Sequence, residues 1–132
     1  MAALDDDVRA LFARPLPGWA TTVRPDGSLH STVVWVDVDD EGVYFNTAAG
    51  RVKERNLAHN PQVSVSVVDP DDIFHYASVS GLGKLQTEGA DAVIDHLAKK
   101  YLGADSYPFR RPGEQRVTVR VDADRVMYSS GS

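Results

Sequence analysis

Alternation of apolar and polar residues with a period of two recurs along the chain and predicts β-strands. It is clearest in residues 62–68, "QVSVSVV", where valines and serines take turns. Residues 18–38 predict two strands around the turn Pro25-Asp26-Gly27-Ser28, because proline presets the turn and glycine accepts a positive φ. Further strands are predicted at residues 43–48 and 73–87, and one or two more at residues 116–129.

The same alternation assigns the side chains of residues 29–36 to two faces of one predicted strand. One face carries Leu29, Ser31, Val33 and Trp35, and the other carries His30, Thr32, Val34 and Val36. Farther along the chain, Gly81 and Gly83 interrupt an otherwise regular strand pattern. Glycines inside a strand predict a bend or a bulge at that point.

Three segments follow a helical period instead. The first begins at the aspartates of residues 5–7 and ends before Pro15. Residues 50–60 favour a short helix that Asn60-Pro61 would end. Residues 91–103 favour a longer helix with Gly103 as its C-cap.

Six or seven strands with three helices and mostly short connections predict antiparallel pairing. We therefore expect a mainly β fold with peripheral helices, in the form of a small antiparallel β-barrel. The chain has 132 residues, which predicts a single domain over residues 1–132.

Composition narrows the function classes. Hydrophobic residues make up 42% and charged residues 25%, as in ordinary globular proteins. The net charge of −5 argues against a general binder of nucleic acid or anionic membrane, so any anion site must be local. Cysteine is absent, which excludes disulfides and thiolate chemistry. The acidic N-terminal segment lacks the pattern of a signal peptide, and we expect a cytoplasmic protein.

A local cluster of cations follows Gly50 in this acidic chain: Arg51, Lys53 and Arg55. Free N–H groups at the start of the predicted helix, together with these charges, suit a phosphate. On a helix only Arg51 and Arg55 would share a face, unless Arg51 lies in the loop and Lys53 turns toward the same ligand. A solvated helix face is the alternative.

The neighbouring segments supply candidate contacts for a flat ring. Hydroxyl and amide groups next to apolar ones, including Asn46 and Thr47, suit a heteroaromatic ring that is packed on its faces and hydrogen-bonded at its edge. Phe74 and Tyr76 lie on one side of a predicted strand and His75 on the other. The histidines lack metal-site spacing, so we expect no metal. No G-x-S-x-G elbow or dinucleotide fingerprint occurs.

Three segments together carry a family resemblance: "ATTVRPDGSLHSTVVWV", "VYFNTAAGRVKERNLAHNPQVSVSVVD" and "HYASVSGLGKL". They resemble the split β-barrel flavin and deazaflavin family related to pyridoxamine 5′-phosphate oxidase. Within it, they are most similar to the small actinobacterial branch that uses the deazaflavin coenzyme F420. The resemblance covers residues 8–128 and is most specific from Phe45 to Val68.

The resemblance implies a homodimeric split β-barrel with two cofactors, each in a groove at the subunit boundary. It implies that the ring is lined by one strand, that the basic cluster holds the phosphate and acidic tail, and that an aromatic segment approaches from the other subunit. The residues so implied are His30, Ser31, Thr32, Val33, Asn46, Thr47, Arg51, Lys53, Arg55, Phe74, His75 and Tyr76.

The implied chemistry is hydride transfer from reduced F420 to a small electron-poor acceptor, such as an enone, quinone or tetrapyrrole. The matching proton would come from solvent, His75 or Tyr76. Three cations beside one groove favour F420, with its longer acidic tail, over FMN. An FMN-dependent oxidase or reductase, a non-catalytic F420-binding protein and a barrel without cofactor remain as alternatives.

Overall fold

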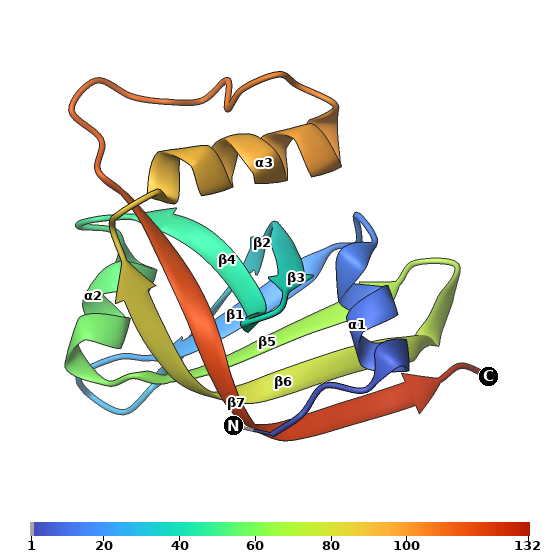
Figure 1. The fold of residues 1–132 in the computed structure, drawn as a ribbon. Coiled ribbons are helices and arrows are strands. Elements are labelled where there is room, and N and C mark those ends of the chain that lie inside the picture. Colours follow the sequence, from blue (N-terminus) through green and yellow to red (C-terminus); the bar gives the residue numbers. More distant parts are fainter. Residues whose placement is uncertain (1) are drawn as a thin grey trace.

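A computed structural model describes residues 2–132 as one curled sheet with three helices (Figure 1). The three predicted helices and all predicted strand segments are present, and residues 116–129 lie in a single strand. None of the helices described in residues 2–132 has the length and hydropathy required to cross a membrane. In chain order the elements are α1 (Asp6–Ala13), β1 (Gly18–Val23), β2 (Leu29–Val34), β3 (Val36–Asp39), β4 (Gly42–Ala48), α2 (Val52–His59), β5 (Gln62–Asp69), β6 (Asp72–Gln86), α3 (Ala90–Leu102) and β7 (Arg116–Ser130).

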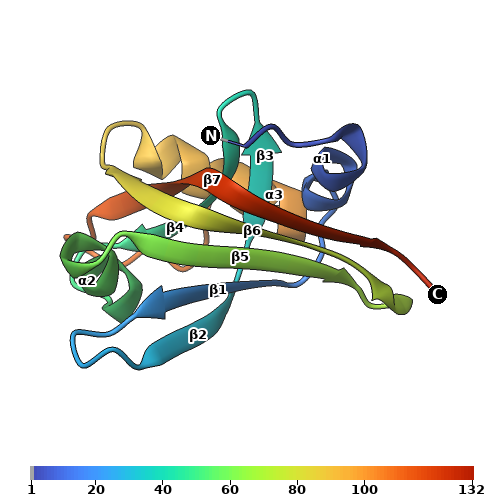
Figure 2. The ribbon, with the colours of Figure 1, turned by 90° about the horizontal axis from the view of Figure 1, so that it is seen from below.

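The seven strands form one antiparallel sheet in the order β2-β1-β5-β6-β7-β4-β3. Its two edge strands, β2 and β3, are consecutive in the chain and are separated by Trp35 alone. The sheet must therefore curl until its edges meet at this residue, which produces the half-barrel seen in Figures 1 and 2. The mainly β, antiparallel fold is confirmed, but the predicted single strand through residues 29–38 is wrong, because it breaks at Trp35.

A bulge bends the two longest strands where the glycines predicted one. The register between β6 and β7 shifts after Ser80, and Asp124 becomes an extra residue on β7. A Cβ atom on Gly81 would collide with the backbone oxygen of Asp122. Only glycine allows the strands to approach this closely, so the bulge and its curvature depend on Gly81.

The concave face of the sheet encloses the main core. Valines of β5, β6 and β7 form its centre, and α1 covers one opening with Leu11 and Phe12. Near the opposite end, Leu57 of α2 adds to the same core. The alternation in the sequence works for β1 and β5 because each of these strands buries one face and leaves the other more exposed, whereas β4 is buried on both faces.

Helix α3 packs outside the barrel and is fastened to the seam by two polar side chains. Lys100 Nζ donates to the carbonyl oxygens of Phe12 (2.9 Å) and Val36 (2.6 Å), while Tyr101 donates to Leu16 O at 2.7 Å. Burial lowers the pKa of Lys100, and the nearby Asp37 carboxylate opposes this shift. These bonds hold α3 beside the break between β2 and β3, where the cavity described next is found.

Candidate functional site

A cavity of about 230 Å³ opens at the seam where the two sheet edges meet. Its walls come from the end of β2, the end of β4, the start of α2, the inner face of α3, and the segment before β7. We call it the seam cavity. It is lined by Val33, Val34, Trp35, Asn46, Thr47, Arg51, Lys53, Ile94, Leu97, Tyr107, Phe109 and Arg116.

Two of the three predicted cations reach this cavity. Arg51 is the N-cap of α2 and has an extended backbone, so the direction of its side chain does not follow the spacing of helical residues. Arg51 and Lys53 therefore both line the cavity. Lys53 Nζ donates to Thr32 Oγ1 at 2.7 Å. Burial, and secondly the charge of Arg51, lower the pKa of Lys53. Arg55 is exposed, does not line the cavity and forms no ion pair within residues 2–132.

The predicted cradle of backbone N–H groups is partly taken by the protein itself. The Gly50 N–H, just before α2, donates to Glu54 Oε1 at 3.0 Å. A carboxylate in the first turn satisfies free donors in the same way that a bound anion would. Side-chain cations therefore carry more of the anion-binding capacity here than the helix start does.

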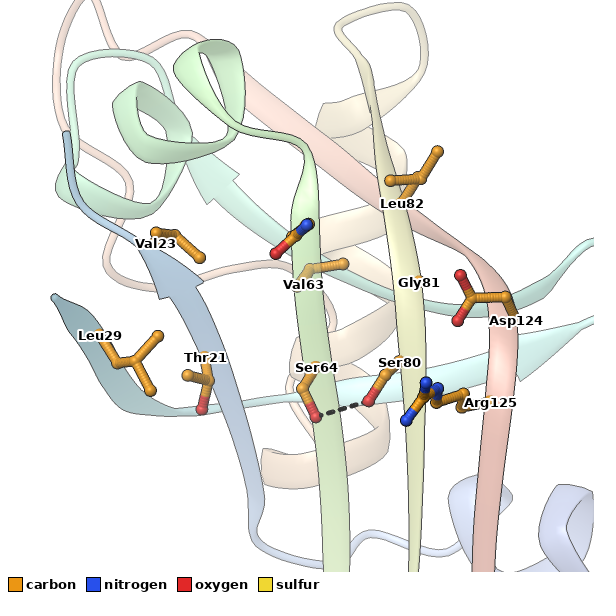
Figure 3. A pocket seen from close by; sticks show the side chains of 11 residues that line it. Thr21, Val23, Leu29, Val63, Ser64, Ser80, Gly81, Leu82, Asp124 and Arg125 are labelled. Atoms are coloured by element: carbon orange, nitrogen blue, oxygen red, sulfur yellow. Dashed lines mark hydrogen bonds between the residues drawn. The ribbon is translucent and has the colours of Figure 1, made fainter. Parts of the chain in front are cut away.

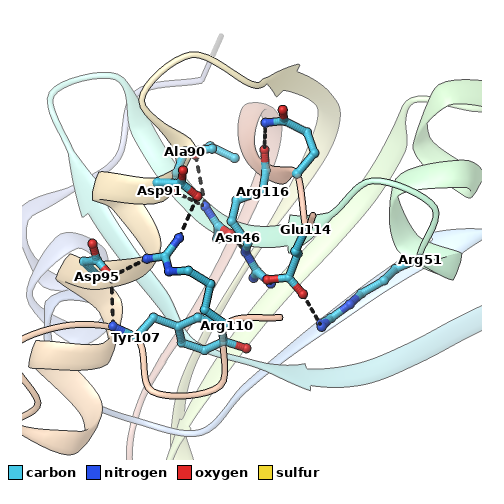
Figure 4. A network of polar contacts seen from close by, with 11 residues as sticks. Asn46, Arg51, Ala90, Asp91, Asp95, Tyr107, Arg110, Glu114 and Arg116 are labelled. Atoms are coloured by element: carbon cyan, nitrogen blue, oxygen red, sulfur yellow. Dashed lines mark hydrogen bonds and ion pairs between the residues drawn. The ribbon is translucent and has the colours of Figure 1, made fainter. Parts of the chain in front are cut away.

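A buried arginine that the sequence did not single out forms the floor of the polar region (Figure 4). Arg116, at the start of β7, is only 2% exposed. Its Nε donates to Asn46 Oδ1 at 2.9 Å, and its Nη1 donates to Glu114 Oε1 at 3.0 Å. The guanidinium also lies over the Tyr107 ring, 5.0 Å from its centre. A buried charge needs such partners, because unpaired it would be strongly destabilising.

Asn46 and Thr47, the two residues of β4 that were predicted to contact the ring, differ in how far their hydrogen bonds are satisfied. Asn46 is fully engaged: besides accepting from Arg116, its amide donates to Ala90 O (3.0 Å) and Thr118 Oγ1 (3.3 Å). Thr47 Oγ1 is buried and has no hydrogen-bond partner among residues 2–132. Because an unsatisfied buried hydroxyl is costly, a ligand that bonds to it would be favoured. Thr47 is therefore the stronger candidate for direct contact with a cofactor.

Aromatic side chains close the cavity, and sequence reasoning missed them. Trp35 stacks on Tyr101 (ring centres 5.7 Å apart) and meets Tyr107 edge-on at 6.1 Å. Arg110 ties the loop before β7 to α3 through Asp91 and Asp95, both at 2.8 Å. This loop, predicted only as irregular, positions the Tyr107 and Phe109 rings at the cavity wall. In the sequence, the run of four apolar residues 33–36 is the local signal that the alternation of apolar and polar residues ends near Trp35.

The residues of β2 divide between two surfaces. Thr32 contacts Lys53, whereas Ser31 shares a hydrogen bond with Thr21 on the outer face (2.7 Å between the hydroxyl oxygens). His30 Nδ1 is buried without a partner among the described residues, and burial, followed by the charges of Arg24 and Lys53, lowers its pKa. Neither His30 nor Ser31 lines the seam cavity.

The aromatic segment at the start of β6 lies outside the seam cavity of its own chain. There His75 has both ring nitrogens near partners: Nδ1 is 3.5 Å from Asp69 Oδ2, and Nε2 is 3.3 Å from the Tyr128 hydroxyl. Arg14 also contacts Asp69, at 3.1 Å. The predicted contact of Phe74, His75 and Tyr76 with the ring is therefore not formed within one chain.

A second hollow, of about 510 Å³, lies on the outer face of the sheet (Figure 3). A hydrogen bond of 3.1 Å between Ser80 and Ser64 crosses its floor, and Arg125 is its only cation. None of the residues with an unsatisfied buried atom lines it. The seam cavity is therefore the better candidate for an anionic ligand. The hollow is lined by Thr21, Val23, Leu29, Gln62, Val63, Ser64, Ser80, Gly81, Leu82, Asp124 and Arg125.

Comparison with known proteins agrees with the observed fold. The sequence profile of the pyridoxamine 5′-phosphate oxidase family matches residues 4–130. Among solved structures, the chain is similar to an F420 reductase, with 31% identity, a TM-score of 0.80, and coverage of 94% of this chain and 98% of that one. A search of curated proteins returned no match.

Two further structures show the fold alone. A conserved hypothetical protein from Mycobacterium tuberculosis has 23% identity and a TM-score of 0.78, with coverage of 98% of this chain and 86% of that one. General Stress Protein 26 from Bacillus anthracis has 20% identity and a TM-score of 0.72, with coverage of 96% and 94%.

Replacing Arg116 tests the buried network. Arg116→Ala would leave Glu114 and Asn46 without their shared partner, and we expect the free energy of unfolding to fall by about 3–5 kcal/mol. Arg120→Ala is the matched control, since Arg120 lies on the same strand over the Tyr44 ring but pairs with the more exposed Asp39. It should cost about 1 kcal/mol. Equal losses in urea unfolding would contradict this difference.

Proposed function

The chain belongs to the pyridoxamine 5′-phosphate oxidase family, and we propose that it is a reductase that depends on coenzyme F420. Its fold and its likeness to an F420 reductase support this class of oxidoreductase. One observation carries the choice of site. Arg51 and Lys53 converge on a small, partly aromatic cavity in a chain whose net charge is −5.

The residues of the seam cavity fit such a cofactor. Lys53 and Arg51 would hold the phosphate, and Arg55, exposed nearby, would meet the acidic tail. The unsatisfied Thr47 hydroxyl would bond to a polar edge of the ring. Thr32, already bonded to Lys53, would keep that ammonium in place, while Val33 and Val34 supply apolar contact.

The remaining predicted ring contacts lie next to this group. His30 and Ser31 precede Thr32 on the edge strand β2 and would extend the binding surface beyond the cavity. His30 Nδ1, buried and unpaired, is a second atom that a ligand could satisfy. Asn46 would act through Arg116, because its own polar atoms are engaged.

When bound, reduced F420 supplies a hydride, which a small electron-poor acceptor such as an enone, quinone or tetrapyrrole takes up together with one proton. Of the two predicted proton donors, His75 and Tyr76, we favour His75. Asp69 lies 3.5 Å from its Nδ1 and would orient the ring, while its Nε2 would exchange the 3.3 Å contact with the Tyr128 hydroxyl for one with the acceptor. In the proposed dimer, this histidine serves the cavity of the other subunit.

We propose a homodimer because the cavity alone is too small. Its volume of about 230 Å³ is below the roughly 300–1,000 Å³ of pockets that enclose a ligand of this size. Val33 belongs both to the cavity and to a row of five residues on the outer face, called the apolar row, in which two serines lie between exposed apolar side chains: Val33 and Met127 are each 59% exposed and Trp19 is 46% exposed. Strand register places Val33, Trp19, Ser66, Ser78 and Met127 side by side across five strands.

FMN is the alternative cofactor, since the matching family is named for pyridoxamine 5′-phosphate oxidase and includes flavin-binding members. Its single phosphate could occupy the same pair of cations, Arg51 and Lys53. Protein that is yellow with FMN after purification, and that does not bind F420, would replace our assignment by this one.

Removing the Lys53 charge tests the proposed site. We expect Lys53→Ala to weaken F420 binding about tenfold to a hundredfold, since a hydrogen bond to a charged group contributes roughly 1.5–3 kcal/mol. Lys84→Ala is the control, because Lys84 pairs with Asp122 away from the cavity. Fluorescence titration measures both, and wild-type affinity in the Lys53 variant would rule out this role.

The affinity for F420 measured in this titration should also depend on pH. The Lys53 ammonium binds an anion only while protonated, so affinity is full below its pKa and falls as pH rises through it. Burial and Arg51 set that pKa below the usual value, so the loss should begin at a lower pH than for an exposed lysine. Lys53→Ala should lack this dependence.

Subunit mass tests the proposed dimer. The wild-type chain should have twice its 14.4 kDa mass in light scattering, and Met127→Glu should shift it toward 14.4 kDa by placing charge in the apolar row. Leu102→Glu, on the exposed end of α3, is the control and should leave the mass unchanged. A monomeric wild-type protein would overturn this assembly.

A further inference from the structure

One carboxylate stands between the two arginines of the site (Figure 4). Glu114 precedes β7, and its side chain is only 7% exposed. Its Oε1 accepts from Arg116 Nη1 at 3.0 Å, and its Oε2 lies 3.4 Å from Arg51 Nη2. Glu114 therefore joins the buried arginine to the exposed cation at the cavity.

The two arginines depend on this carboxylate to different degrees. Arg116 has further partners in Asn46 Oδ1 and the Tyr107 ring. Arg51 has Glu114 as its only ion-pair partner among residues 2–132. A phosphate that binds Arg51 must share it with Glu114, and it meets a fixed negative charge that has little access to screening water.

We propose that Glu114 adjusts which phosphate the seam cavity accepts, by penalising a doubly charged phosphate monoester more than a singly charged phosphodiester. Electrostatic repulsion is proportional to the charge of the ligand, so Glu114 penalises a dianion about twice as much, in free energy, as a monoanion. F420 carries its phosphate as a diester, and FMN carries a monoester that is close to dianionic above pH 7. The inference rests on the proposed function and gives that site its selectivity.

Glu114→Gln removes the charge while keeping the size of the side chain and an acceptor oxygen for Arg116. We expect FMN to bind about tenfold more tightly to this variant and F420 about threefold, because the two effects scale with phosphate charge. Riboflavin and the phosphate-free deazaflavin should bind as they do to the wild type. Each affinity is divided by that of the phosphate-free ligand, so that a general change in packing cancels.

Glu88→Gln is the matched control, since it removes the same charge from an exposed residue that forms no ion pair within residues 2–132. It should leave both ratios unchanged. An unchanged ratio of FMN to riboflavin in Glu114→Gln, or an equal rise for FMN and F420, would overturn the inference while leaving the proposed function intact. Binding of neither phosphate-bearing ligand to the wild type would overturn both.

A second variant keeps the test independent of changes in packing. Glu114→Asp retains the negative charge and shortens the side chain, so both ratios should stay near their wild-type values. A rise of the FMN ratio in Glu114→Asp equal to that in Glu114→Gln would show that side-chain shape, and not the charge of Glu114, controls phosphate binding.

Discussion

The single residue between β2 and β3 is the constraint on which the site depends. These strands are the two edges of a seven-stranded sheet, and Trp35 alone joins them, so the sheet must close at that point and diverge elsewhere. Hydrogen bonding ends at both edges, and the gap between them is filled by Trp35, α3 and the loop before β7. The seam cavity is the part of that gap which side chains leave open.

The cations around the cavity differ in how deeply they are buried. Arg116 is buried and neutralised by Glu114, whereas Arg51 and Lys53 lie nearer the solvent. Burial lowers the pKa of Lys53, which means that its charge is held at some cost and would be stabilised by an anion. An acidic protein can in this way keep a positive site without a basic surface, because the relevant charges are few, close together and partly screened from water.

Sequence periodicity predicted the elements well because the alternation or helical spacing of apolar residues within a segment reflects which of its faces is buried. The bulge at Gly81 and the extended position of Arg51 follow from backbone rules that a sequence displays directly. The burial of Arg116 at the cavity could not be predicted from the sequence, because the alternation of residues only places this side chain on one face of β7. Its partners include Asn46, which is 70 residues away in the chain and is brought beside it by tertiary packing, and the ring of Tyr107 in the loop before β7.

Phe74, His75 and Tyr76 lie outside the cavity of their own chain, so their contact with the ring stays a prediction that depends on the proposed dimer. A crystal structure of the protein with F420 bound is the most direct test of the account. It should show the phosphate between Arg51 and Lys53, with Thr47 Oγ1 bonded to the ligand. F420 bound in the outer hollow, with Arg51 unchanged on Glu114 and Thr47 still unpaired, would contradict the account.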